Sequence, residues 1–189
     1  MDTTTYTLTI EGVSPLVMNS NAALMNGRED KGRDPAQYER EHFLDKTYRD
    51  DGGHLVIPSR ALKKSFIEAC KFLQMKPKGV AFKSYGPFIQ SATLFPEDAV
   101  LDVPIEKVKP LTLVVNLDPT KGPKGARGPR TRPVIAPPWN ASTTVMSLDP
   151  ILTLDVLQQI AEKAGKQVGL LDGRAIDFGR CLITVRPSR

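Results

Sequence analysis

The chain of 189 residues and 20.8 kDa has 40% hydrophobic and 25% charged residues, which is the composition of an ordinary globular domain. It is long enough to fold around one core without disulfides, and its apolar runs are far too short to span a membrane, so we expect a single cytoplasmic domain over residues 1–189. Its net charge of +5, with a pI near 9.2, favours polyanionic partners. The two cysteines, Cys70 and Cys181, form no metal-binding pattern, so we expect no metal and no other cofactor.

The N-terminal third predicts two strands separated by an irregular segment. Residues 3–12 alternate apolar side chains with threonine and glutamate, which is typical of a half-buried strand. Polar residues and turn signals fill residues 21–50, which we interpret as an insertion after the first strand. A short helix over 37–46 is expected within it, and residues 55–57 form the next strand.

A helix and three strands follow in the middle of the chain. Pro58 is suited to the first turn of a helix, where its missing N–H group has no consequence. Residues 88–95, 99–103 and 111–117 are rich in β-branched and aromatic residues and predict three short strands. The apolar stripe of the helix consists of Leu62, Ser65, Phe66, Ala69, Cys70 and Leu73.

A basic stretch rich in glycine and proline comes next. Residues 119–140 hold five basic residues and no acidic residue, which accounts for the net charge of the whole chain. Half of the 16 prolines lie between residues 104 and 138, so we expect neither a helix nor an interior strand but a projecting, thumb-like loop over residues 118–139. Cations three residues apart in an extended chain are roughly 10 Å apart and can follow the phosphates of a single strand. The five cations are Lys121, Lys124, Arg127, Arg130 and Arg132.

Two features of this stretch have more than one interpretation. The basic loop could instead be a solvated linker that binds nothing. Trp139, which follows it, could stack on a base or anchor the next strand in the core.

The C-terminal third predicts a strand, a helix and a final strand. Residues 141–148 form the first of these, and Thr153 is suited to cap the helix that follows. Gly165 is expected to end this helix, and residues 181–185 form the last strand. The apolar face of the helix consists of Val156, Leu157, Ile160, Ala161 and Ala164.

Without the insertion and the loop, the order is strand, helix, strand, strand, helix, strand. This is the βαββαβ plan of a ferredoxin-like (RRM-like) fold of the α+β class. Both helices would cover one face of an antiparallel sheet and leave the other face, or the loops at its edge, free to bind.

A glycine-rich segment over residues 168–180 precedes the last strand. Its glycines permit close backbone approach, and its arginines supply positive charge, as a phosphate-binding loop requires. The same pattern is compatible with a wide turn whose arginines are solvated. The residues concerned are Gly169, Gly173, Arg174, Gly179 and Arg180.

Three separated segments, Ile10–Met18, Tyr48–Phe66 and Gly169–Arg180, together resemble the RAMP superfamily, whose members include the backbone subunits of CRISPR effector complexes. The resemblance implies an RRM-like core, and the basic loop matches the position of the protruding thumb in backbone subunits. It implies nucleic-acid contacts in the glycine-rich segment, although Leu171 and Asp177 stand where many members have glycine. At the entry to the first helix it implies nucleic-acid contacts for Arg60, Lys63 and Lys64.

Catalysis is the less favoured interpretation. The only histidines, His42 and His54, lie in polar segments without a partner arrangement typical of nucleophilic catalysis, and His54 follows two glycines in a predicted turn. Asp45, Asp50 and Asp51 lie where some RAMP backbone subunits carry a catalytic aspartate. We assign no catalytic residue, and a metal-independent endoribonuclease using His42 or His54 is kept as an alternative.

The sequence therefore predicts a protein that binds single-stranded nucleic acid through phosphates and base stacking. As a CRISPR-type backbone subunit it would assemble head-to-tail with copies of itself along the strand, with other effector subunits as further partners and no contact with a membrane. A stand-alone, phage-type protein that coats single-stranded DNA and a protein-only assembly subunit are the alternatives. The sequence does not distinguish RNA from DNA.

Overall fold

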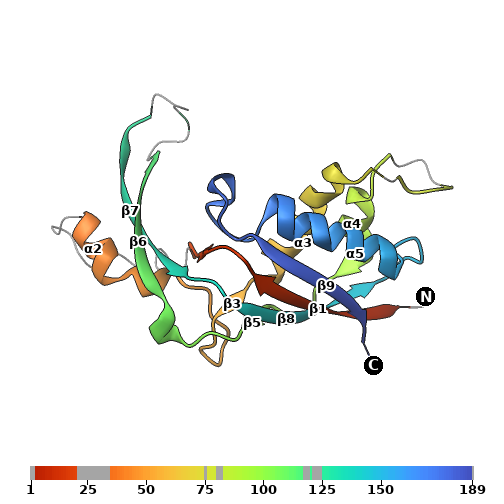
Figure 1. The fold of residues 1–189 in the computed structure, drawn as a ribbon, viewed down its shortest axis with the longest axis horizontal. Helices are drawn as coiled ribbons and strands as arrows, with labels where there is room; N and C mark the ends of the chain where they lie inside the picture. Colours follow the sequence, from red (N-terminus) through yellow and green to blue (C-terminus); the bar gives the residue numbers. More distant parts are fainter. Residues whose placement is uncertain are drawn as a thin grey trace.

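Two antiparallel sheets organise the chain (Figure 1). The computed structural model describes residues 3–20, 35–74, 76–79, 83–116, 120 and 125–188. A six-stranded sheet carries helices on one face, and a three-stranded sheet projects from it as a long hairpin. None of the helices in this described part of the chain is long and apolar enough to cross a membrane.

The centre of the large sheet is strand β1 (Thr4–Gly12). It pairs on one side with β8 (Asn140–Ser147) and on the other with β9 (Cys181–Pro187), both antiparallel. The alternation predicted for this segment is confirmed, because Leu8 and Ile10 are fully buried while Thr9 between them is exposed. Burying each of these two side chains contributes about 1.5–3 kcal/mol.

The remaining strands of this sheet are short. Strands β4 (Thr93–Leu94) and β5 (Ala99–Leu101) pair with different parts of β8, and β3 (Val56–Ile57) pairs with β5. The order β9, β1, β8, and then β4 with β5, is that of a ferredoxin-like sheet, in which the second strand is here split in two. The predicted α+β, ferredoxin-like core is therefore confirmed.

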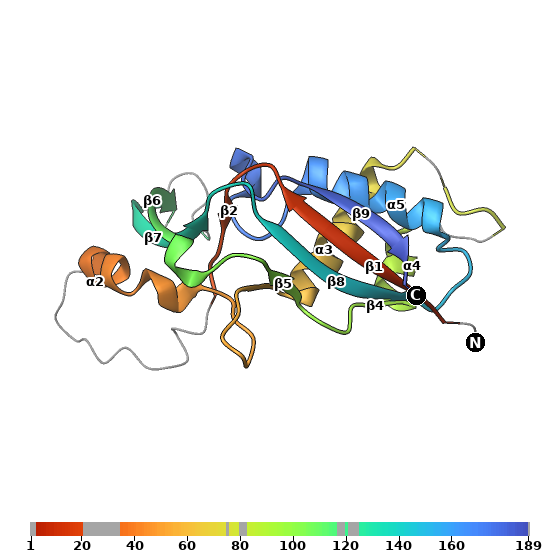
Figure 2. The ribbon, with the colours of Figure 1, turned by 60° about the horizontal axis from the view of Figure 1, so that its bottom comes forward.

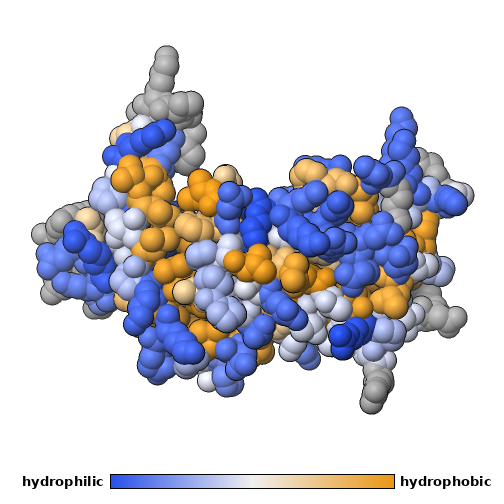
Figure 3. All heavy atoms as spheres, in the orientation of Figure 1, coloured by the Kyte–Doolittle hydropathy of each residue, from blue (hydrophilic) through white to orange (hydrophobic). Residues whose placement is uncertain are grey.

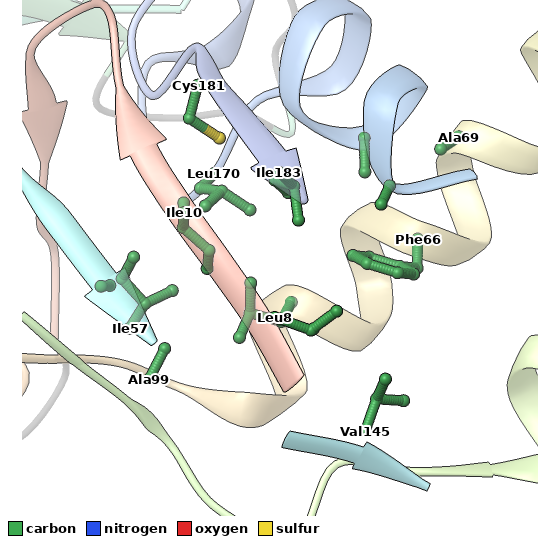
Figure 4. Packing of buried hydrophobic residues seen from close by; sticks show 14 of the residues in the cluster. Leu8, Ile10, Ile57, Phe66, Ala69, Ala99, Val145, Leu170, Cys181 and Ile183 are labelled. Atoms are coloured by element: carbon green, nitrogen blue, oxygen red, sulfur yellow. The ribbon is translucent and has the colours of Figure 1, made fainter. Parts of the chain in front are cut away.

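Helices α3 (Ser59–Ala69) and α5 (Leu154–Lys163) cover one face of the sheet (Figure 2). Thr153 caps α5 as predicted, since its hydroxyl accepts a hydrogen bond from the N–H group of Val156 at 3.4 Å. Figure 4 shows Phe66 of α3 in the same core as side chains of the sheet. The two apolar helix faces are buried as expected, through Leu62, Ser65, Phe66 and Ala69 on α3 and Val156, Leu157, Ile160 and Ala161 on α5.

The predicted strand over 88–95 is wrong for most of its length. Residues Gly86–Ala92 form helix α4, and only the two residues of β4 are extended. Pro87 lies in the first turn of α4, and the neighbouring Phe88 and Ile89 are both buried. A short apolar run does not distinguish a buried helix from a buried strand, and packing against α3 decides the outcome.

The predicted end of α5 at Gly165 is also wrong. The helix continues through a π-helical turn, η5 (Ala164–Val168), and ends at Gly169, whose φ is +81°. Gly165 serves a different purpose, because a Cβ atom there would lie 2.3 Å from the carbonyl oxygen of Cys181. The glycine lets the helix lie directly against the start of β9.

The projecting hairpin consists of β6 (Lys109–Asn116) and β7 (Arg127–Ile135), and β2 (Leu16–Val17) pairs with the base of β7. The basic stretch therefore projects as expected, but its second half is a strand in the middle of a sheet rather than an irregular loop. Residues 117–119 and 121–124, including Lys121 and Lys124, lie outside the described residues.

Proline is tolerated in β7 because of the register of the hairpin. Pro133 lies opposite Pro110, so this pair has no N–H group and exchanges no ladder hydrogen bond. Pro129 is four residues from Pro133 and therefore has the same orientation in the ladder. The N–H group of Thr131, which lies between the two prolines, points away from β6 and donates to Glu39 at 3.0 Å.

The predicted short helix in the insertion is confirmed as two pieces. Helix α2 (Pro35–Glu41) and the 3-10 turn η1 (Phe43–Lys46) pack against β7. Residues 21–34 of the predicted insertion lie outside the described residues.

The outer edge of β9 is closed by a side chain. Gln158 of α5 donates from Nε2 to the carbonyl of Ile183 at 3.2 Å, and its Oε1 accepts from the N–H group of Val185 at 2.8 Å. One glutamine thus occupies the place of a neighbouring strand, and this part of the edge cannot pair with another chain.

We expect Gln158→Leu to lower the free energy of unfolding by about 1–3 kcal/mol, because it leaves the Ile183 carbonyl and the Val185 N–H group without partners. Gln159→Leu is the matched control, since the Gln159 amide contacts only Asp155 on the exposed face. Urea denaturation of both variants measures the difference. Equal stability of the two variants would show that the edge is not capped by Gln158.

Candidate nucleic-acid interface

The glycine-rich loop over residues 168–180 lies against helix α3. Gly169, Gly173 and Gly179 all have positive φ values, of 81°, 72° and 70°. The two sides of the loop approach closely at Gly179, where a Cβ atom would lie 2.0 Å from the carbonyl oxygen of Leu170. The N–H group of Leu170 donates to the Gly179 carbonyl at 2.9 Å, so the closed loop requires glycine at position 179.

Leu171 and Asp177 adopt the left-handed conformation without being glycine. Their φ values are 59° and 64°. These are the two positions where the sequence departs from the glycines of many RAMP proteins. The loop therefore keeps a glycine-like backbone path there, with a strain of roughly 1–2 kcal/mol at each residue.

Both arginines of the loop are held by contacts within the chain. Arg174 donates from Nη1 to Oε2 of Glu68 on α3 at 2.7 Å. Arg180 donates from Nη2 to the Arg174 carbonyl at 3.2 Å and to Asp177 at 3.3 Å. These bonds fix the loop over the helix.

The base of the hairpin is fastened to the same loop. Arg132 of β7 forms an ion pair and hydrogen bond with Asp172, and the Asp172 N–H group donates to the Val17 carbonyl at 3.1 Å. The hairpin, the loop and α3 therefore meet at one junction.

A buried carboxylate connects the insertion to the hairpin. Glu39 of α2 is only 7% exposed and lies 3.2 Å from Nη1 of Arg130 and 3.1 Å from Nζ of Lys46. It also accepts from the Thr131 N–H group. Arg130 and Arg132 thus have carboxylate partners within the chain, whereas Arg127 is exposed.

Trp139 is part of the core and cannot stack on a base. It is 1% exposed, and its Nε1 donates to the carbonyl of Ser14 at 2.9 Å. The ring covers Gly12, where a Cβ atom would lie 2.0 Å from it. The stacking interpretation is wrong, and the core-anchor interpretation is confirmed.

The three cations at the entry to α3 have different surroundings. Lys63 donates from Nζ to the carbonyl of Thr93 at 2.8 Å and so ties the helix to β4. Arg60 and Lys64 are exposed, and neither has an ion pair among the described residues. Lys71 is exposed two residues beyond the end of α3, in the 3-10 turn Cys70–Phe72.

Arg60, Lys64 and Lys71 form a stripe along one face of α3 and its 3-10 extension, which we call the α3 stripe. The spacings of four and seven residues put these side chains on one side of the helix, roughly 16 Å from end to end. Glu68 lies on the same face, and Arg174 neutralises it. The spacing of these residues in the sequence already indicates the stripe, because it places them on the side of the helix opposite the apolar face.

Three adjoining hollows flank the α3 stripe. The first, of about 420 Å³, lies between Tyr48, the α3 stripe and the loop. It shares Tyr48 and Arg60 with a second hollow of about 560 Å³. It shares Asp172 and Arg174 with a third hollow of about 650 Å³, which lies at the C-terminal end of the stripe. The hollows and the α3 stripe form one continuous surface, which we call the α3–loop surface.

Tyr48 is a lining residue that the sequence analysis did not single out as a site residue. Its hydroxyl donates to the Asn19 carbonyl at 3.0 Å. Burial raises the pKa of Tyr48 above its ordinary value of 10.0, so the hydroxyl stays neutral at physiological pH.

The open face of the large sheet is a poor stacking surface. It presents hydroxyl side chains such as Thr7, Thr9, Ser142 and Thr144, and among the described residues of β1, β8 and β9 it carries no aromatic side chain. RRM domains bind bases through aromatic side chains on this face. The α3–loop surface is therefore the better candidate.

Neither histidine lines these hollows. His42 stacks on Tyr38 with ring centroids 4.3 Å apart, and its Nδ1 lies 3.5 Å from Asp45. His54 follows the turn at Asp51 and Gly52, and its Nδ1 is 3.0 Å from Asp50, whose pKa is lowered by the hydrogen bond from the His54 N–H group. In the part of the chain that the structure describes, no group of three or more potential metal ligands occurs.

The split ferredoxin-like sheet, the glycine-rich loop against α3 and the projecting hairpin together form the fold that the resemblance implies, and solved structures share this fold. No protein-family model matches the sequence, and neither does any curated protein.

The solved structures with this fold include two chains of low sequence identity to this one. One is a chain of the type III-B Cmr-beta structure determined with cognate target RNA, with a TM-score of 0.58 and 13% identity over 98% of this chain and 59% of that chain. The other is Cmr6 from Pyrococcus furiosus, with a TM-score of 0.50 and 13% identity over 96% of this chain and 99% of that chain. This chain thus spans about three fifths of the length of the first chain and nearly all of Cmr6.

We expect Gly179→Ala to lower the free energy of unfolding by about 2–4 kcal/mol, because the new methyl group must displace the Leu170 backbone at a position of positive φ. Gly53→Ala is the control, since Gly53 also has positive φ but nothing lies within 4 Å of the added atom. It should lose about 1 kcal/mol. Chemical denaturation distinguishes the two, and similar losses would contradict the close approach.

Proposed function

We propose that this protein binds single-stranded RNA through the phosphate backbone, as a CRISPR-type effector subunit. The observation that carries the proposal is the α3 stripe, whose Arg60 and Lys64 are exposed beside the glycine-rich loop and have no carboxylate partner in the part of the chain that the structure describes. The fold similarity to a chain of a complex determined with target RNA favours RNA as the ligand.

The charge balance of the α3–loop surface supports anion binding. The carboxylates that line the first and third hollows, Glu68 and Asp172, are each paired with an arginine and so do not repel a phosphate strongly. Asp45 and Asp98 line only the second hollow. The cations of the α3 stripe add three positive charges without such partners among the described residues. Cations that are not already paired with a carboxylate attract the negatively charged strand most strongly.

The spacing of the stripe supports binding along the backbone of a strand. Cations one or two helix turns apart on one face can contact successive phosphates of an extended strand. Such contacts carry no base identity, and so the affinity should depend little on sequence.

Head-to-tail assembly is part of the proposal. The β6–β7 hairpin reaches well beyond the core (Figure 1), and in Figure 3 apolar side chains follow it while hydrophilic ones mostly cover the helices on this side. Val114 on β6 is 72% exposed. A hairpin that touches a different surface on the next copy forms a heterologous contact, which extends along a strand instead of closing a dimer.

We expect the double variant Arg60→Ala/Lys64→Ala to bind single-stranded RNA more weakly for all base sequences. The slope of log affinity against log salt concentration should become less negative by about 1.4, which corresponds to two lost phosphate contacts on a single strand. Lys78→Ala, an exposed lysine outside the α3–loop surface, should leave affinity and slope unchanged. Fluorescence anisotropy at several salt concentrations measures both quantities.

Two results of this titration would contradict the proposal. Wild-type affinity that does not change with salt would exclude phosphate binding. Tighter binding of DNA than of RNA of the same sequence would favour the DNA-coating alternative.

A second experiment tests the assembly. Replacing residues 117–126 with a short Gly/Ser linker keeps both strands of the hairpin and the contacts of Glu39 and Asp172. We expect unchanged affinity for a short RNA and loss of the sigmoidal titration on a long RNA, because the tip no longer reaches the neighbour. Cooperative loading by this variant would show that the tip takes no part in assembly.

A further inference from the structure

The third hollow contains an exposed aromatic ring. Phe72 ends the 3-10 turn η2 (Cys70–Phe72) at the C-terminal end of the α3 stripe and is 49% exposed. It has no ring contact with another aromatic side chain among the described residues. Ligand pockets are lined by apolar and aromatic side chains with a few polar groups, so a half-exposed ring that lines a hollow is a candidate contact site.

Cations surround this ring. Lys71, Arg174 and Arg180 line the same hollow, and the Glu68 carboxylate there is neutralised by Arg174. Nη1 of Arg180 is buried and has no hydrogen-bond partner within the described chain, so this guanidinium has donor capacity that the protein does not use. An aromatic face beside cations that keep unused N–H donors is a combination that binds a nucleotide, with the base on the ring and the phosphate on the cations.

We propose that the third hollow holds one unstacked base of the bound strand against the ring of Phe72, with its phosphate near Lys71 and Arg180. This inference rests on the proposed RNA binding and adds to it a stacking residue that Trp139, being buried, cannot supply. The hollow volume of about 650 Å³ lies within the range of sites that hold small ligands. Stacking on a ring accepts any base, which agrees with the sequence-independent contacts along the stripe.

The charges favour a nucleotide over a protein partner. A docking site for an apolar side chain needs no cations, and burying Lys71 and Arg180 beneath a protein would require acidic partners. A nucleotide supplies both an apolar face and an anion.

The test is the binding of short RNA by Phe72 variants. Phe72→Ala should weaken the affinity about 5- to 150-fold, which corresponds to the 1–3 kcal/mol of one base stacked on an aromatic ring. Phe72→Trp should restore it, whereas Phe72→Leu, which keeps an apolar side chain, should not. Leu94→Ala is the matched control, because Leu94 is 48% exposed on the large sheet away from the surface.

An RNA with abasic residues supplies the second readout. Wild-type protein should bind this abasic strand as weakly as Phe72→Ala binds normal RNA. The Phe72→Ala substitution should not weaken binding of the abasic strand any further.

Three outcomes would overturn the inference. If wild type binds normal RNA well and Phe72→Ala binds it just as tightly, the inference that a base stacks on Phe72 is wrong and the proposed function stands. If the substitution changes only cooperative loading on long RNA, Phe72 contacts protein. If wild type binds no single strand at all, the proposed function itself fails.

Discussion

The junction of the glycine-rich loop with α3 and the hairpin depends on two ion pairs. Arg174 joins the loop to Glu68 of the helix, and Arg132 joins the hairpin to Asp172 of the loop. In each pair, the arginine neutralises a carboxylate that would otherwise repel a polyanion. The same contacts that position the loop therefore leave the cations of α3 available to a polyanion.

The hairpin is held at its other side by a single buried carboxylate. Glu39 accepts from Arg130 and the Thr131 N–H group and forms an ion pair with Lys46, which compensates for removing the carboxylate from water. Because the Thr131 N–H group points away from β6 and β2 does not extend as far as Thr131, the insertion supplies the acceptor that the ladder lacks. The insertion is thus a structural support of the hairpin. Lys46 and Arg130 contribute to this support through their ion pairs with Glu39.

Local patterns predicted the core well and the peripheral contacts poorly. The alternation in β1, the apolar face of α3 and the Thr153 cap depend on neighbours within a few residues, and all were correct. The run over 88–95 satisfies both helix and strand patterns, and its outcome depends on packing against α3. The prolines of the basic stretch argue against a strand until the register with β6 is known.

The ferredoxin-like plan, the glycine-rich loop and the basic character of the binding candidates could be predicted from the amino-acid sequence, because periodicity, glycine content and charge are local properties. Which cations are free depends on tertiary contacts. Arg130 and Arg132 find carboxylates 91 and 40 residues away, whereas Arg60 and Lys64 find none among the described residues. Tertiary contacts also decide which aromatic ring is exposed, since Trp139 is covered by packing on Gly12 and Phe72 emerges at the end of a helix. Charge pairing and burial depend on distances in space, and these distances join residues that the sequence keeps far apart.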